Sequence, residues 1–246
     1  MKKHAILFSG GKNFTNNAPR YKNDLEFAYR VLVENCGFKE DDIEVLYANG
    51  RDIYYNGESI PTRVASKKNF DNVISFKKRV LEKDDVLILV VSNHGDDENG
   101  GHILVWGEGQ PNIPLKEVVD SMNDIDARKI LLLGQCYAGN ILDYDICNAC
   151  IITANMKGLQ SYTNPHNIYY DEFFYHFLSF IHGRYPDGKP LAEIGENDVD
   201  KAFSYAMRMD AFAPGNPIGE EINKEREDKI IEIPQIKCNI VGNIAI

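Results

Sequence analysis

The sequence predicts a layered α/β fold with a mostly parallel central sheet, and two observations lead to this class. Short apolar runs without polar interruption, of which Val86 to Val91 is the strongest, are typical of strands that are buried on both faces. Segments with apolar residues at helical spacing lie between these runs. Such alternation of strands and helices indicates a parallel sheet with helical crossovers.

The strands are assigned from the apolar runs, in chain order. They are expected at residues 5–8, 43–47, 86–91, 130–133 and 151–152, with a short strand at 102–106 that returns as a hairpin. Residues 48–66 contain Gly50, Gly57 and Pro61, and are expected to form a long loop with room for a small hairpin. Residues 230–246 are expected to add one or two terminal strands.

Helices are expected where apolar residues recur every three or four positions. They cover residues 25–36, 70–81, 114–122, 171–181 and, as the last one, 199–206. Gly37 lies where a helix would stop, and Pro114 is expected in the first turn, which proline favours. Asn197 is a suitable N-cap for the last helix. Residues 214–229 are charged, contain Gly and Pro, and receive no element.

Composition and charge limit the classes of function. The chain has 246 residues, 43% of them hydrophobic, so it can bury a core without disulfides or metals, and we expect one domain over residues 1–246. A formal charge of -10 and a pI of about 5.1 disfavour nucleic acid and membrane surfaces as partners.

The N-terminus and the cysteines bear on the compartment. The apolar run from Ala5 to Phe8 is too short for the core of a signal peptide, and no stretch approaches the length of a membrane span. Five cysteines are an odd number and do not form the pattern of a disulfide framework. We therefore expect a cytoplasmic protein with reduced thiols.

Two of the apolar runs end in residues that support nucleophilic chemistry. His94 follows the strand at 86–91, and Cys136 follows the strand at 130–133. Because α/β folds place their sites at the carboxyl ends of parallel strands, both side chains are expected at one edge of the sheet. A nucleophilic cysteine needs its thiolate, and a neighbouring imidazole accepts the proton. The sequence therefore predicts a catalytic pair that needs no metal or cofactor.

Glycine beside the histidine fits the same chemistry. A tetrahedral intermediate needs backbone N–H donors directed at its oxyanion. Gly95 has no side chain, so its amide can approach a substrate carbonyl closely. The amide of Cys136 is the expected second donor.

Other residues compete with this interpretation. Cys147 and Cys150 form a C-x-x-C pair, which is a weak signal for zinc or redox chemistry without a second pair or a histidine at ligand spacing. His166 lies in a loop that contains proline and is the main rival for the role of base. A single cysteine or histidine is more often structural than catalytic.

At this point the sequence resembles a known family. The run Val86 to Gly95 resembles the apolar strand and His-Gly motif of legumains, caspases and their relatives. The run Ile130 to Cys136 resembles their strand that ends at the nucleophile. Thr153-Ala154-Asn155 and Ser161-Tyr162 resemble a segment that lines the legumain substrate pocket. The resemblance covers roughly residues 3–180.

The resemblance implies a caspase-like three-layer sandwich, with helices on both faces of the sheet. It implies a cysteine endopeptidase that forms an acyl-enzyme on Cys136, with His94 as the general base and a peptide or protein as substrate. Arg20, Ser161 and Asp171 match positions that bind substrate in legumain. This match implies a preference for Asn or Asp before the scissile bond.

The sequence departs from the family pattern in two places. Gly134 stands two residues before Cys136, where legumain has Glu and caspases have Gln. Ala18 stands where legumain has an Asn that orients the histidine, so the third catalytic member is unassigned. Two alternatives stay open. One is a catalytically weak or inactive caspase-like binding module, and the other is a different hydrolase with a cysteine nucleophile.

Overall fold

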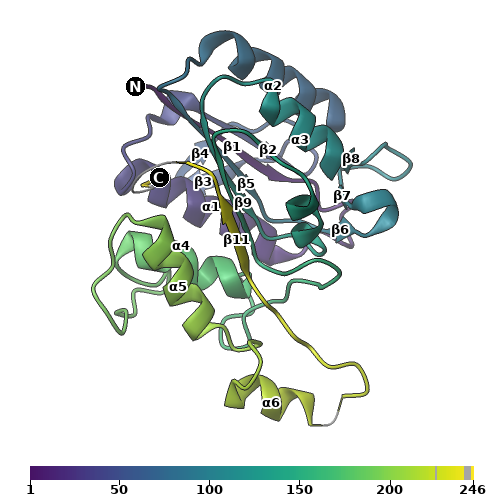
Figure 1. Cartoon of the computed structure of the whole chain (residues 1–246), viewed down its shortest axis with the longest axis vertical. Coiled ribbons are helices and arrows are strands. Elements are labelled where there is room, and N and C mark those ends of the chain that lie inside the picture. Colours follow the sequence, from purple (N-terminus) through teal and green to yellow (C-terminus); the bar gives the residue numbers. More distant parts are fainter. Residues whose placement is uncertain (225, 241–244) are drawn as a thin grey trace.

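A computed structural model describes residues 1–224, 226–240 and 245–246 (Figure 1). At its centre is a sheet of β1 (Lys3–Ser9), β2 (Ile43–Tyr47), β5 (Val86–Val91), β9 (Arg128–Leu133), β10 (Ala149–Thr153) and β11 (Gln235–Cys238). The strands lie in the order β11-β10-β9-β5-β1-β2. All neighbours are parallel except β11, which runs antiparallel to β10. The expected mostly parallel sheet is therefore confirmed.

Helices cover both faces of this sheet (Figure 1). They are α1 (Pro19–Glu34), α2 (Lys67–Val80), α3 (Leu115–Asn123), α4 (Glu172–His182) and α5 (Val199–Met209). A further helix, α6 (Pro217–Asn223), lies away from the sheet (Figure 1). The layer of α2 and α3 packs on one face, and α1, α4 and α5 pack on the other. The three-layer arrangement is confirmed.

The sequence pattern of the strands explains the two layers. Along β1, Ala5 and Leu7 pack with α1, α4 and α5, whereas Ile6 and Phe8 pack with α2 and α3. Side chains alternate along a strand, so a strand between two helical layers must be apolar at every position. A fully buried Leu, Ile or Phe side chain contributes roughly 1.5–3 kcal/mol relative to an exposed one. A slip by one residue would exchange the two packed sets.

Two small sheets lie outside the central one. The expected hairpin in residues 48–66 is formed by β3 (Ile53–Tyr55) and β4 (Glu58–Ile60). A second sheet consists of β6 (Gly95–Asp96), β7 (His102–Ile103) and β8 (Ile113–Pro114). Its middle strand is shorter than the expected 102–106. Short 3-10 helices cover Glu40–Asp42, Glu98–Gly100 and Ala138–Asp143.

The starts of two helices differ from the expectation. Pro114 is the N-cap of α3, one position before the helix. The N-cap of α5 is Asp198, whose carboxylate accepts the Lys201 amide at 3.0 Å. The Asn197 side chain instead bonds to the backbone of Ile246. Its Nδ2 donates to the Ile246 carbonyl oxygen, and its Oδ1 accepts the Ile246 amide.

The C-terminal region differs in two further respects. Helix α6 was not expected, although Asn216 caps it and Pro217 opens it. Among residues 230–246, the described part forms one strand, β11, and positions 241–244 of the expected strands lie outside the described residues.

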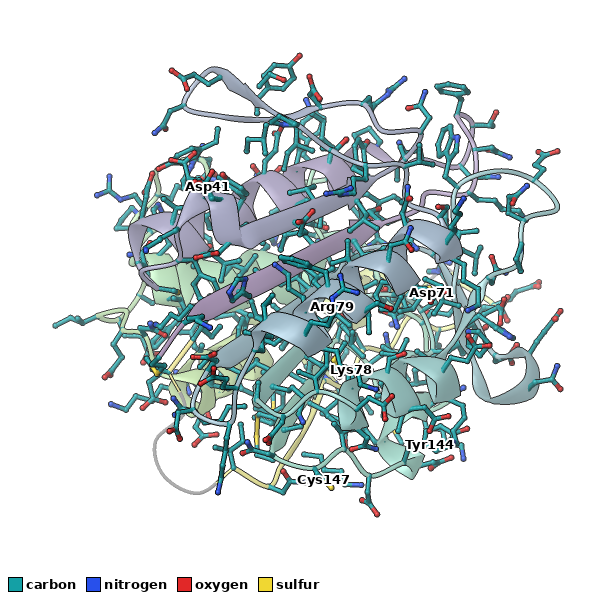
Figure 2. All side chains as sticks on the ribbon, turned by 90° about the horizontal axis from the view of Figure 1, so that it is seen from above. Asp41, Asp71, Lys78, Arg79, Tyr144 and Cys147 are labelled. Atoms are coloured by element: carbon teal, nitrogen blue, oxygen red, sulfur yellow. A yellow bond between two sulfur atoms is a disulfide. The ribbon has the colours of Figure 1, made fainter. Side chains whose placement is uncertain are left out.

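The cysteines correct the expectation of reduced thiols. Cys150 on β10 lies opposite Cys238 on β11, and the two form a disulfide. Cys36, Cys136 and Cys147 are free, and Cys147 is exposed near the periphery of the molecule (Figure 2). The C-x-x-C pair is therefore divided between a disulfide and a surface thiol. Within the described ranges, no group of three or more His, Cys, Asp or Glu residues is arranged to hold a metal ion.

Helix α2 shows how the outer layer meets water. Ser66 caps its first turn by accepting the Asn69 amide at 3.2 Å. Asp71, Lys78 and Arg79 are exposed on the helix (Figure 2). Among the described residues, no helix has the length and apolar character needed to cross a bilayer.

Candidate active site

The central strands bring the two expected catalytic segments to one edge of the sheet. Strands β5 and β9 are parallel neighbours, with Val91 opposite Leu133, and the Gly134 amide donates to the Val91 carbonyl at 2.7 Å. His94 follows β5 and Cys136 follows β9. A Cβ on Gly95 would lie 2.2 Å from the Cys136 carbonyl oxygen. Only glycine allows the two segments to approach this closely.

His94 is held by one hydrogen bond from its ring. Its Nε2 lies 2.8 Å from the backbone carbonyl oxygen of Asn16. Because a carbonyl only accepts, Nε2 carries the proton in the neutral ring, and Nδ1 keeps a lone pair for a proton acceptor role. Burial lowers the pKa of His94 below its ordinary value, and the charges of Arg20 and Lys12 act in the same direction.

Cys136 is partly exposed and lies above Ser161. Its Sγ is 3.8 Å from the Ser161 carbonyl oxygen and 3.9 Å from the Ser161 hydroxyl. That hydroxyl donates to the Gly134 carbonyl at 2.6 Å. Ser161, which was expected to bind substrate, therefore lies next to the thiol, and its hydroxyl is hydrogen-bonded to the end of β9.

Two backbone amides near the thiol are free of ladder bonds. The Leu104 amide donates to the His94 carbonyl, so the next pair, Gly95 and Ile103, is a non-hydrogen-bonded pair of the antiparallel ladder. The Gly95 amide is therefore not used by β7. Within the described part of the chain, the Cys136 amide also has no backbone acceptor. Free amides of this kind are what an oxyanion requires.

Arg20 and Asp171 form a buried ion pair. Arg20 Nη1 lies 3.2 Å from Asp171 Oδ2. The other carboxylate oxygen of Asp171 accepts the Phe174 amide at 3.1 Å, so Asp171 is also the N-cap of α4. The structure thus joins the two expected pocket residues to each other. Both carboxylate oxygens of Asp171 therefore already have a partner, whereas Arg20 donates one of its five N–H groups to Asp171.

Asp24 completes this buried group. It accepts the Ser92 hydroxyl at 2.5 Å and the Asp171 amide at 3.1 Å. Burial and the nearby Asp171 raise the pKa of Asp24 to about 8. Burial raises the pKa of Asp171 to about 6, although Arg20 opposes the shift. Two buried carboxyl groups thus lie beside a single guanidinium, that of Arg20.

Further buried carboxyl groups accept backbone amides of Tyr162 and Ala211. Glu232 accepts the Tyr162 amide at 2.9 Å, and Glu172 accepts the Ala211 amide at 2.6 Å. Burial raises the pKa of Asp210 to about 8 and that of Glu232 well above its ordinary value. Glu172 therefore connects the segment after α5 to the start of α4. Glu232 connects the segment before β11 to the loop beside Cys136.

Three features of the site were missed from the sequence. The partner of His94 is a backbone carbonyl at Asn16, and every residue type offers such a group. Asp24 follows Arg20 by four positions on α1, and this helical spacing was the available signal. Tyr21 lies edge-on to the His94 ring, and its position next to Arg20 was the only hint.

The rival base lies elsewhere. His166 is exposed on a loop beside α6, where it lines an open groove together with Pro217 and Ile218. His176 bonds to Tyr185, and His182 bonds to Asn35. His94 is the histidine that the sheet brings to the Cys136 edge.

Comparisons with known proteins identify the fold. No family model matches the chain, and no curated protein sequence matches it. Protein GSU0716 from Geobacter sulfurreducens superimposes with a TM-score of 0.63 at 11% identity, over 96% of this chain and 93% of that one. Caspase-1 from Spodoptera frugiperda superimposes with a TM-score of 0.62 at 11% identity, over 99% and 89%. The chain has a caspase-like fold.

Proposed function

We propose that this chain is a cysteine peptidase, with Cys136 as the nucleophile and His94 as the general base. The observation that carries the proposal is that β5 and β9, which lead to these two residues, are adjacent parallel strands. The fold shared with a caspase supports the same reaction class. The free amides of Gly95 and Cys136 supply the hydrogen-bond donors that an oxyanion needs.

The reaction follows from the groups at this edge. Nδ1 of His94 takes the thiol proton, and the thiolate of Cys136 attacks the peptide carbonyl carbon. The amides of Gly95 and Cys136 donate to the resulting oxyanion. His94 then gives its proton to the leaving amine, and an acyl-enzyme remains. A water molecule, deprotonated by His94, attacks this thioester and regenerates the thiol.

For the residue before the scissile bond, we propose Asn or Asp. Asp171 is occupied by Arg20 and by the α4 amide, so it offers no free acceptor for a basic side chain. Arg20 keeps four N–H donors beyond the one that binds Asp171. The oxygen of an Asn or Asp side chain matches these donors, whereas Arg and Lys would meet a like charge.

The test is the cleavage of fluorogenic peptides that differ only at this position, with Asn, Asp, Arg, Lys or Leu. We expect Asn or Asp peptides to be cleaved at least about tenfold faster than the others, the size of one good charged hydrogen bond. Preference for Arg or Lys would refute the Arg20-dominated pocket. Preference for Leu would remove Arg20 and Asp171 from substrate binding.

The catalytic assignment is tested in the same assay. Cys136→Ala should abolish cleavage, and His94→Ala should lower turnover by about a thousandfold. His166→Ala is the matched control and should change turnover less than about twofold, because that ring is exposed and lines a groove with α6. Activity retained in Cys136→Ala would end the proposal, and a larger loss in His166→Ala would move the base.

A further inference from the structure

Tyr21 contacts the proposed base although no catalytic role requires a tyrosine. Its ring lies edge-on to the His94 imidazole, with 5.2 Å between ring centroids and an interplanar angle of 77°. Tyr21 is 1% exposed and belongs to the first turns of α1. The Arg20 guanidinium carbon lies 5.2 Å from the same ring. The aromatic ring therefore contacts both the proposed base and the Arg20 guanidinium.

The imidazole needs this contact because its single hydrogen bond fixes only one atom. The Nε2 bond to Asn16 leaves the ring free to tilt about that contact. Asn16 and Tyr21 belong to one short segment at the start of α1, and the Tyr21 amide is tied to the Ala18 carbonyl at 3.1 Å. One rigid segment thus supplies both the oxygen and the aromatic edge that hold His94.

The hydroxyl of Tyr21 does not take part in this arrangement. It is buried and makes no well-aligned hydrogen bond within the described residues, although the Arg20 guanidinium lies close to it. Burial raises the pKa of Tyr21 to about 12, although Arg20 opposes the shift, so the hydroxyl stays neutral. An unpaired buried hydroxyl is unfavourable, so its removal should not weaken the fold.

We propose that Tyr21 is the positioning residue of His94, and that its ring rather than its hydroxyl directs Nδ1 toward Cys136. This inference rests on the proposed function, because it assumes that His94 acts on the thiol. Small displacements of a catalytic group reduce turnover strongly, whereas substrate affinity depends on other contacts. Loss of the ring should therefore lower kcat and leave KM nearly unchanged.

The experiment measures the alkylation rate of Cys136 by iodoacetamide from pH 5 to 10, together with kcat and KM. In the parent, His94 should accelerate alkylation of Cys136 at pH 6 relative to an ordinary free thiol, because the imidazole takes the thiol proton. Tyr21→Phe should keep this low-pH reactivity, keep kcat within about twofold, and unfold at the same or a higher temperature. Tyr21→Leu should lose at least about tenfold in both alkylation at pH 6 and kcat.

Two further variants keep the result interpretable. Tyr29→Leu removes another tyrosine of α1, 2% exposed and remote from His94, so it should destabilise the fold without changing the alkylation profile. Tyr21→Met, whose unbranched side chain adapts to irregular gaps, replaces Tyr21→Leu if that variant does not fold. Equal losses in Tyr21→Phe and Tyr21→Leu, or none in either, would overturn the positioning role. A parent that alkylates like a free thiol would instead overturn the proposed function itself.

Discussion

The protonation state of His94 decides whether the thiol can be activated. A base must be neutral to accept a proton, and the pKa of His94 is lowered by burial and by the charges of Arg20 and Lys12. Under the proposed mechanism, activity should be lost as the pH falls through this lowered value. The acidic limb of kcat/KM should therefore lie below pH 6.5, the ordinary histidine value.

Lys12→Ala tests the electrostatic part of this prediction. Loss of the nearby positive charge should raise the pKa of His94 and move the acidic limb upward by a few tenths of a pH unit. Lys68→Ala, an exposed lysine on α2, serves as the control and should leave the limb in place. A limb that moves equally in both variants, or in neither, would contradict a specific effect of Lys12.

Asp210 makes a separate prediction about stability. Burial, with a further effect of Glu172, raises its pKa from 3.8 to about 8, so the folded state keeps a proton that the unfolded chain releases. Stability from this group is therefore present below about pH 4 and is lost as the pH rises toward 8. Asn at position 210 is neutral at every pH. Asp210→Asn should therefore reduce the change in the free energy of unfolding between pH 5 and pH 8 by on the order of 2 kcal/mol.

The measurement is the free energy of unfolding in denaturant at pH 5 and pH 8. The exposed Asp200→Asn on α5 is the control and should keep the slope of the parent. Other buried acids with raised pKa, such as Asp24, will leave part of the slope in Asp210→Asn. An unchanged slope in Asp210→Asn would mean that Asp210 is ionised in the folded protein.

Among single residues, the sequence predicted the two side chains that we propose as the catalytic pair. His94 and Cys136 could be found because each directly follows an apolar run. Asn16 could not, because its contribution is a backbone carbonyl. Arg20 and Asp171 were predicted to share a pocket, but their mutual ion pair depends on side-chain geometry that spacing does not determine.

At the scale of elements, β11 depends on contacts distant in sequence. It is an antiparallel edge strand, and the disulfide between Cys150 and Cys238 joins it to β10 across 88 residues. Closing so long a loop stabilises the fold by up to about 4–5 kcal/mol in the chain-entropy description. Reduction should therefore lower the denaturant midpoint of the parent.

Matched variants separate this bond from general thiol effects. A Cys150→Ala, Cys238→Ala double variant should be less stable than the parent and insensitive to reductant. Cys147→Ser removes an exposed free thiol and should retain both the stability and the reductant response of the parent. If reductant leaves the midpoint of the parent unchanged, the two cysteines are not bonded in solution.

Elements with strong patterns were predicted well, and the others were not. Strands β2 and β5 match the expected ranges: β5 is uniformly apolar, and β2 is apolar at every position except Glu44. Helix α6 was missed because seven residues give too few turns for an apolar stripe, although its cap and proline were visible. The disulfide was missed because its partners meet only through the pairing of β10 with β11.

At the scale of the whole molecule, the arrangement of layers is retained where sequence similarity is not. A TM-score of 0.62 to a caspase accompanies 11% identity. Burial on both faces constrains the strands to be apolar without specifying which apolar residue they carry. The strand order then places the ends of β5 and β9 together, and this is why a catalytic pair could be predicted from two apolar runs.

The most direct test of the account compares two thiols of the same molecule. Cys147 is exposed and Cys136 is only partly exposed, so accessibility alone favours Cys147. A peptide with Asn before an electrophilic ketone, followed by mass spectrometry of each cysteine, should label Cys136 at least about a hundredfold faster, because only that thiol is activated. His94→Ala should abolish this advantage. Equal or faster labelling of Cys147 in the parent would contradict a catalytic role for Cys136.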